Sequence, residues 1–150
     1  MITIDGIAGA KALVGQTLGT GPWLPIDQDR VNAFADLTGD HQWIHVDIER
    51  ARQSMFGGTI AHGYLLLSLI PLMTKDIFNV DGVTVRINYG LDRVRFISPV
   101  RVGSNIRLTV AMKAVSDEPK GTRVTLEATL DIDGQAKPAC VADLLLLLVA

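Results

Sequence analysis

The segment TIAHGYLLLSLIPLMTKDIF, residues 59–78, decides the fold class. From Tyr64 to Met73 it is apolar on all sides, which is typical of a helix buried inside a domain. Pro71 has no backbone N–H, so we expect a kink or a break at that point. The apolar run reaches only about half of the roughly 20 residues that a membrane-spanning helix needs. The segment therefore predicts a core helix and no membrane span.

The second half of the chain alternates with the period of β-strands. Residues 106–112 place an apolar side chain at every second position, and residues 124–132 repeat this pattern after a turn-forming segment. Residues 139–149 are almost continuously apolar, as expected of a strand covered on both faces, and residues 82–100 predict one or two further strands. With an N-terminal strand near residues 15–24, these patterns predict a mostly antiparallel, curved sheet of about five or six strands.

A long buried helix followed by a curved antiparallel sheet fits the hotdog arrangement, an α+β fold in which the sheet wraps around the helix. Shorter helices are expected over residues 28–37, capped by Asp27, and over residues 48–55, capped by Asp47. Such sheets commonly pair edge to edge, which hides apolar edge strands, so we expect a homodimer. We expect the whole chain, residues 1–150, to form this one domain.

Composition narrows the class of function. The chain has 14 basic and 16 acidic side chains, and its formal net charge of −2 does not suggest a nucleic-acid partner. Its single cysteine, Cys140, lies in an apolar stretch and is expected to be an inert buried thiol. The N-terminus lacks the basic and apolar regions of a signal peptide, so the cytoplasm is the expected compartment.

The loop LTGDHQWIHVD, residues 37–47, holds two of the three histidines. Asp40 and His45 lie between two predicted helices, where both side chains can surround one small molecule. A carboxylate and an imidazole together can hold a water molecule with its oxygen lone pair turned toward an electrophilic carbon. Spacing alone leaves a structural alternative, in which Asp40 is a turn residue and His45 caps a helix or lies at the surface. With three histidines and one distant cysteine, no metal site is expected.

The residues AHGY, 61–64, begin the buried helix. Backbone N–H groups in the first turn have no partner within a helix and carry the positive end of its dipole. The N–H of Gly63 can therefore polarise a carbonyl oxygen that is becoming an enolate, although Gly63 can also serve only close packing. Together, Asp40, His45 and Gly63 meet the requirements for adding water across a double bond conjugated to a thioester.

Three segments, residues 34–51, 57–71 and 88–103, resemble the MaoC-like (R)-specific enoyl-CoA hydratases, also called hydratase 2. The segments occur in the order that the family has. The resemblance implies a hotdog fold and the addition of water to a trans-2-enoyl-CoA, with an (R)-3-hydroxyacyl-CoA as the product. It also implies that no metal or redox cofactor takes part.

The family pattern Gly-Asp-x-Asn-Pro-x-His is matched in the loop, except that Gln42 and Trp43 replace its Asn-Pro pair. The resemblance implies that Asp40 and His45 are the catalytic pair. It further implies that the backbone of Gly63 donates to the thioester carbonyl. Because the departure lies at Gln42 and Trp43, it bears on acyl-chain preference more than on the type of reaction.

Substrate contacts are expected from residues in and around these motifs: Gln42, Trp43, Ile44, His62, Tyr64, Asn88, Tyr89, Arg93 and Arg95. The two arginines can meet the phosphates of coenzyme A, although alternating arginines on a strand also fit a solvated face. His62 also fits a purely structural role. Asp143, inside the last apolar strand, has no part in this scheme and is expected at a dimer interface or beside a strand arginine.

Three other functions stay open at this level. A hotdog thioesterase shares the fold and acyl-CoA binding, but it usually carries an acidic residue on or near the central helix, and the apolar face YLLLSLIPLM, residues 64–73, offers no carboxylate. A non-catalytic subunit that binds acyl thioesters would not need Asp40 and His45. An acyl-carrier-protein dehydratase would perform the same chemistry, because the carriers differ only beyond the pantetheine.

Overall fold

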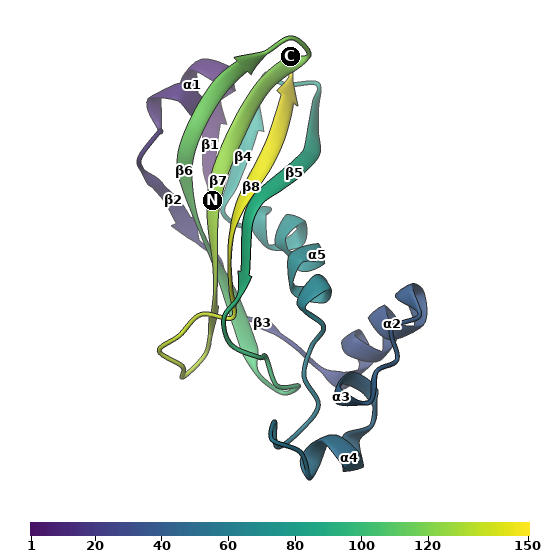
Figure 1. The fold of residues 1–150 in the computed structure, drawn as a ribbon. Coiled ribbons are helices and arrows are strands. Elements are labelled where there is room, and N and C mark those ends of the chain that lie inside the picture. The colour runs from purple at the N-terminus through teal and green to yellow at the C-terminus, as the bar shows by residue number, and fades with distance from the viewer.

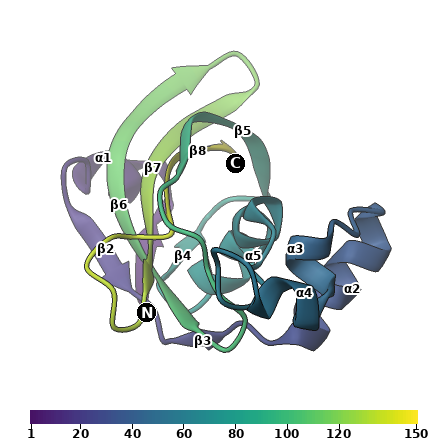
Figure 2. The same ribbon diagram turned by 60° about the horizontal axis from the view of Figure 1, so that its bottom comes forward.

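The computed structural model describes residues 1–150 and consists of a curved sheet that wraps around one long helix (Figure 1, Figure 2). The strands are β1 (Ile2–Asp5), β2 (Thr17–Thr20), β3 (Leu24–Pro25), β4 (Phe78–Asp81), β5 (Val85–Phe96), β6 (Asn105–Glu118), β7 (Gly121–Ile132) and β8 (Cys140–Val149). The helices are α1 (Gly6–Ala12), α2 (Gln28–Thr38), α3 (Trp43–Val46), α4 (Ile48–Arg52) and α5 (Gly63–Thr74). None of these helices combines the length and the apolar character that crossing a bilayer requires.

The main sheet has the strand order β2-β6-β7-β8-β5, β3 also pairs with β6, and every pairing is antiparallel. Along β6 and β7, buried residues alternate with partly buried ones because successive side chains of a strand point to opposite faces. The predicted antiparallel hotdog sheet is confirmed. β5 forms one edge, and two register shifts interrupt its pairing with β8, between Asn88 and Gly90 and between Leu91 and Val94.

Helix α5 lies in the concave side of this sheet (Figure 2). Its inner residues belong to a core cluster that also contains residues of β6, β7 and β8: Leu65, Leu66, Leu69, Ile70 and Met73. The other side of the helix is open, with Tyr64 73% exposed and Leu72 45% exposed. The expected burial of this helix is therefore confirmed for one side only, because the sheet of one chain covers only that side. The helix also continues through Pro71, so there is no break there.

Helices α2, α3 and α4 form a lobe beside the first turn of α5 (Figure 1). The carboxylate of Asp27 accepts a hydrogen bond from the N–H of Arg30 at 2.8 Å, and Gly39 has a φ of 79°, so α2 begins and ends close to its predicted bounds. Asp47 caps α4 as predicted, but α4 ends three residues earlier, at Arg52. The short helix α3, which was not predicted, carries His45.

The N-terminal region contains elements that the sequence pattern did not indicate. Strand β1 pairs in parallel with β4, and α1 follows β1 directly. The strand expected near residues 15–24 is divided into β2 and β3.

Asp143 lies on the face of β8 opposite to Ala142 and Leu144, which belong to the core. Its carboxylate accepts a hydrogen bond from the Lys113 ammonium at 2.6 Å, and the Arg93 Nε lies 3.6 Å from the same oxygen. A buried carboxylate needs such partners, because burial without them would disfavour its charged form. The expected pairing with a strand arginine is confirmed.

Candidate active site

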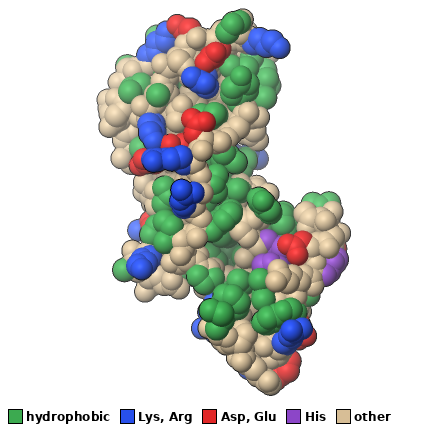
Figure 3. Space-filling model, in the orientation of Figure 1, with side chains coloured by type: hydrophobic (Ala, Val, Ile, Leu, Met, Phe, Trp, Pro, Cys, Tyr) green, Lys and Arg blue, Asp and Glu red, His purple; other side chains and the backbone are tan.

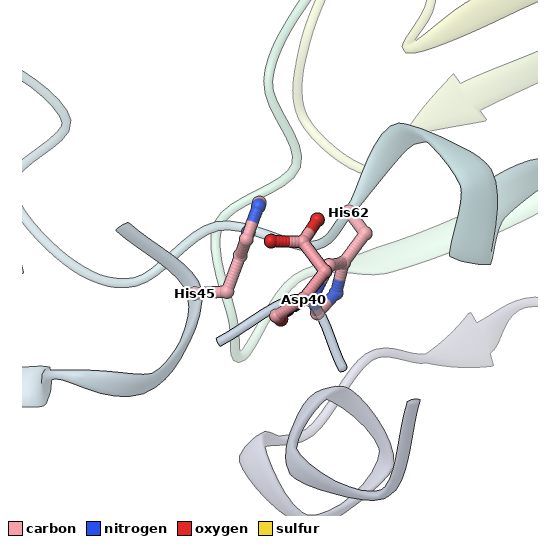
Figure 4. A group of neighbouring side chains, drawn as sticks. All are labelled: Asp40, His45 and His62. Carbon is pink, nitrogen blue, oxygen red and sulfur yellow. Dashed lines mark hydrogen bonds between the residues drawn. The ribbon is translucent and has the colours of Figure 1, made fainter. Parts of the chain in front are cut away.

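Asp40, His45 and His62 come together where the lobe meets the start of α5 (Figure 4). One nitrogen or carboxylate oxygen from each side chain lies within 4.8 Å of those of the other two. Asp40 comes from the loop after α2, His45 from α3, and His62 immediately precedes α5. The two motifs singled out in the sequence are therefore neighbours in space. In Figure 3, hydrophobic side chains line the hollow between the sheet and the lobe, with histidine side chains on the side of the lobe.

His45 is buried, and one of its ring nitrogens is occupied. Nδ1 lies 2.7 Å from the carbonyl oxygen of Ile60. A carbonyl oxygen only accepts hydrogen bonds, so Nδ1 carries the proton and donates it. Burial lowers the pKa of the imidazole below its ordinary value of 6.5, and the neighbouring His62 acts in the same direction, while the bond to Ile60 and the charge of Asp40 oppose the change. The ring is neutral at pH 7, so Nε2 has a free lone pair.

Asp40 is exposed and takes part in no ion pair. Its carboxylate accepts only the backbone N–H of Gln42, at 3.4 Å. Its backbone carbonyl accepts a hydrogen bond from the Nε2–H of His62, at 3.0 Å. The carboxylate is thus free to accept a hydrogen bond from a water molecule next to His45.

His62 is only 2% exposed. Its ring stacks on that of His45, with centroids 3.8 Å apart and planes at 22°, and it also contacts the ring of Phe34 at 5.0 Å. Nδ1 of His62 is buried without a hydrogen-bond partner. This burial leaves almost no surface for the substrate contact that was expected of His62.

The same three side chains are the residues that could hold a metal ion. An imidazole binds a metal through a lone pair in its ring plane, at about 2.0–2.1 Å for zinc. Two nearly parallel rings with centroids 3.8 Å apart do not turn these lone pairs toward a common point. The geometry therefore suits a water molecule between Asp40 and His45 better than a metal chelate.

Gly63 begins α5, and neither its backbone N–H nor that of Tyr64 donates to any group of the protein. These are first-turn groups, whose partial positive charge favours an oxygen that is gaining negative charge. The structure also gives a packing reason for the glycine. A Cβ atom at this position would lie 3.0 Å from ring carbons of Phe96 on β5, a neighbour that the sequence pattern did not indicate.

The other expected substrate residues lie at different distances from this group. Gln42 precedes α3 and is exposed, and the Trp43 ring lies under the Arg50 guanidinium, 4.2 Å from its centroid. The carbonyl oxygen of Ile44 accepts the backbone N–H of Ile60 at 2.9 Å. These three residues therefore lie next to His45 in the same segment, and the contacts of Trp43 and Ile44 are with other parts of the protein.

Asn88 and Tyr89 line a cavity of about 680 Å³ between α5, β5 and β8, whose lining is largely apolar. Tyr64 lies at the open side of α5 with its ring edge-on to Phe96. Arg93 and Arg95 are not brought to the Asp40–His45 group: Arg93 pairs with Asp143 on the outer face of the sheet, and Arg95 contacts only a backbone carbonyl.

The side chain of Gln28 supports the helix that carries His45. The Gln28 amide donates to the backbone carbonyl of His45 at 2.8 Å and accepts from the Thr59 hydroxyl at 2.6 Å, so it holds α3 against the segment before α5. Nothing in the spacing of Gln28 indicates this role.

His41 is exposed and lies 2.8 Å from Asp36, and this hydrogen bond raises the pKa of His41 above its ordinary value. Of the two loop histidines, only His45 reaches the site.

The chain is similar to proteins of known family. The sequence pattern of the MaoC-like domain family matches residues 10–133. The chain is 47% identical to 3-hydroxyacyl-thioester dehydratase Z of Mycobacterium tuberculosis over the full length of both proteins. It is 43% identical to nodulation protein N of Rhizobium meliloti, over 91% of this chain and 87% of that protein.

Among solved structures, the (R)-hydratase of A. caviae involved in PHA biosynthesis superposes with a TM-score of 0.73 at 26% identity, over 90% of this chain and 96% of that one. The R-hydratase PhaJ1 of Pseudomonas aeruginosa superposes with a TM-score of 0.73 at 24% identity, over 91% of this chain and 81% of that one. The second likeness supports the fold alone.

Proposed function

The chain belongs to the MaoC-like domain family, and from this membership we propose that it is a hydro-lyase of the 3-hydroxyacyl-thioester dehydratase type. In the proposed reaction it adds water reversibly to a trans-2-enoyl-CoA and forms an (R)-3-hydroxyacyl-CoA. The name of the relative that is 47% identical and the name of the A. caviae hydratase support this class of reaction.

One observation carries the proposal: a free carboxylate and an imidazole nitrogen with a free lone pair face the same small space. A water molecule there would donate one hydrogen to Asp40 and the other to Nε2 of His45. Both hydrogens would then point away from the substrate, so a lone pair of the oxygen faces C3. As the C3–O bond forms, Asp40, helped by His45, takes a proton from the water.

Negative charge moves to the thioester oxygen as C3 is attacked. The N–H of Gly63 donates to this oxygen and stabilises the enolate, because it has no partner within the protein and lies at the positive end of α5. The proton taken from the water then returns to C2 on the same face of the substrate. The water supplies both parts of the addition, so the proposed reaction uses no metal or redox cofactor.

The acyl chain is proposed to occupy the cavity beside α5. One of its lining residues, Leu67, follows Gly63 by one helical turn, which is a rise of about 6 Å. A thioester carbonyl held at Gly63 would therefore leave the acyl chain next to the apolar lining. The residues there, including Leu144 and Leu146, suit a hydrocarbon chain.

The test is to add the protein to crotonyl-CoA and follow the absorbance of the conjugated thioester together with the release of free CoA. Loss of absorbance without free CoA, with (R)-3-hydroxybutyryl-CoA as the product, is the expected result. Release of CoA would instead indicate a thioesterase. No reaction with crotonyl-CoA, or with the same acyl group on an acyl carrier protein, would indicate a non-catalytic subunit, and reaction only on the carrier protein would change the proposed substrate.

The pH dependence follows from the burial of His45. Protonation of Nε2 would remove the lone pair that accepts the water, and the pKa of His45 is lowered from 6.5. We expect kcat/KM to stay level as the pH falls through 6.5 and to decline only at lower pH, when the imidazole becomes charged. A pH profile of kcat/KM measures this, and an acid limb centred above the ordinary histidine value would contradict the assignment of His45.

We also propose that two chains pair through the open edge of the sheet. Apolar side chains along β5 and just beyond it are between 43% and 55% exposed: Val85, Ile87, Tyr89, Leu91, Phe96 and Ile97. Their free strand edge and the open side of α5 form the kind of surface that a symmetric dimer buries.

Replacing Ile87 by Glu should therefore shift the protein toward monomers. In a symmetric dimer each of the two chains carries the substitution, so two carboxylates would be placed in an apolar interface. Light scattering after size-exclusion chromatography is expected to give twice the chain mass for the parent and a lower average mass for Ile87→Glu. Thr17→Glu, on the opposite edge of the sheet, is the matched control and should remain dimeric. A monomeric parent protein would contradict the proposal.

A further inference from the structure

His62 connects the parts of the candidate site. The backbone of His62 is bonded to the first turn of α5, because its carbonyl accepts hydrogen bonds from the N–H groups of Leu65 and Leu66. The ring is therefore attached to the start of this helix. We propose that His62 is a positioning residue, which holds the Asp40 backbone and the His45 ring in their reactive arrangement without touching the substrate. This inference rests on the proposed function of Asp40 and His45.

The hydrogen bond from His62 links the backbone of Asp40 to the start of α5. It measures 3.0 Å between Nε2 and the Asp40 carbonyl oxygen. The other two hydrogen bonds that Asp40 makes are longer: 3.5 Å from its N–H to the Thr38 hydroxyl and 3.4 Å from the Gln42 N–H to its carboxylate. The loop is otherwise exposed, so His62 is what fixes Asp40 to the rigid start of α5.

The packing of His62 is the argument that its N–H contributes as well as its shape. The ring lies between Phe34 and His45 and is almost completely buried. Nδ1 has no partner there, and an unsatisfied buried acceptor is unfavourable. A phenylalanine would fill this space without that cost. The histidine therefore contributes something that a plain ring cannot, and the donor at Nε2 is the polar contact it makes.

The stacked arrangement also keeps His45 in the form that the proposed reaction needs. Asp40 and His62 are the titratable groups whose charges act on the His45 ring, and His62 lowers the pKa of His45. Two imidazoles at 3.8 Å would repel each other if both were charged. The contact with His62 thus favours a neutral His45 and, with it, a free Nε2.

Two substitutions separate the donor from the ring. His62→Phe keeps a flat ring but has no N–H, whereas His62→Gln keeps a donor at the end of its side chain but has no ring. We expect His62→Phe to lower kcat for crotonyl-CoA by about 100-fold, the typical effect of a small displacement of reacting groups, with little change in KM. His62→Gln should recover at least about a tenth of the parent kcat because it can still bond to the Asp40 carbonyl.

Full activity of His62→Phe would overturn the proposal, as would a His62→Gln protein as impaired as His62→Phe. A rise in KM with unchanged kcat would make His62 a substrate contact instead. Thermal unfolding of both variants shows whether a loss of activity comes from misfolding. If one variant does not fold, the activity of the other, folded variant decides whether the proposal stands.

A second measurement does not depend on activity. The chain has three histidines, so their ring signals can be followed separately by NMR. The titration of His45 is expected to move to higher pH in both His62 variants, and an unchanged titration would contradict the coupling. If the parent protein hydrated no enoyl thioester, the proposed function would fail, while this titration would still test the contact between the two rings.

Discussion

Replacing Asp40 by Asn is expected to lower kcat/KM for the hydration of crotonyl-CoA by about two to four orders of magnitude. The amide has nearly the size of the carboxylate, but it cannot take a proton from the attacking water. Asp40 is exposed and forms no ion pair, so the substitution should leave the melting temperature unchanged. The measurement is the initial rate of absorbance loss as a function of substrate concentration.

The matched control for this variant is Asp36→Asn. Asp36 is another exposed carboxylate, only four residues away, but it bonds to His41 and not to the site. It should therefore keep nearly the full rate. Full activity of Asp40→Asn, or an equal loss in both variants, would refute the role given to Asp40.

The second large effect is expected at His45. His45→Gln should also lose about two to four orders of magnitude in kcat/KM, because it removes the ring nitrogen that accepts a hydrogen bond from the water molecule. It also removes the donor to the Ile60 carbonyl, which would leave a buried acceptor unpaired and cost about 1–3 kcal/mol of unfolding free energy. A loss of activity in this variant alone could therefore come from either cause.

His45→Asn separates the two causes. Its amide nitrogen can occupy the place of Nδ1 and keep the bond to Ile60, but the side chain has nothing at the position of Nε2. We expect it to be more stable than His45→Gln and equally inactive. His41→Gln, in the same loop but pointing to Asp36, is the control and should be active. Activity in His45→Asn near that of the parent would show that Nε2 is not needed.

The sequence was sufficient for features that depend on local signals. The caps of α2 were predictable because Asp27 and Gly39 act on their own helix end. The strands β6 and β7 were predictable because an alternating pattern of apolar side chains has the period of a strand. Asp40, His45 and Gly63 were proposed from the chemistry of two short motifs, and the structure brings the segments that carry them together.

The rest depends on contacts between distant segments. The hydrogen bond of His62 to Asp40 spans 22 residues, and the Gln28 bond to His45 spans 17, so no local pattern contains them. Phe96 reaches Gly63 only because the end of β5 lies beside the start of α5. The open side of α5 could not be predicted for a similar reason. A helix that is apolar on all sides has the same sequence pattern whether its own chain or a second chain covers it.

The irregular pairing of β5 has a consequence for solubility. A regular edge strand with apolar side chains accepts almost any extended peptide and is a frequent starting point of aggregation. In β5 the two register shifts interrupt the row of backbone donors and acceptors, between Asn88 and Gly90 and between Leu91 and Val94. A chance peptide would match only part of this row, whereas a second copy would bring the same irregularity in the opposite direction. We therefore expect the interrupted edge to disfavour fibril-like growth, with a second copy of the chain as its proposed partner.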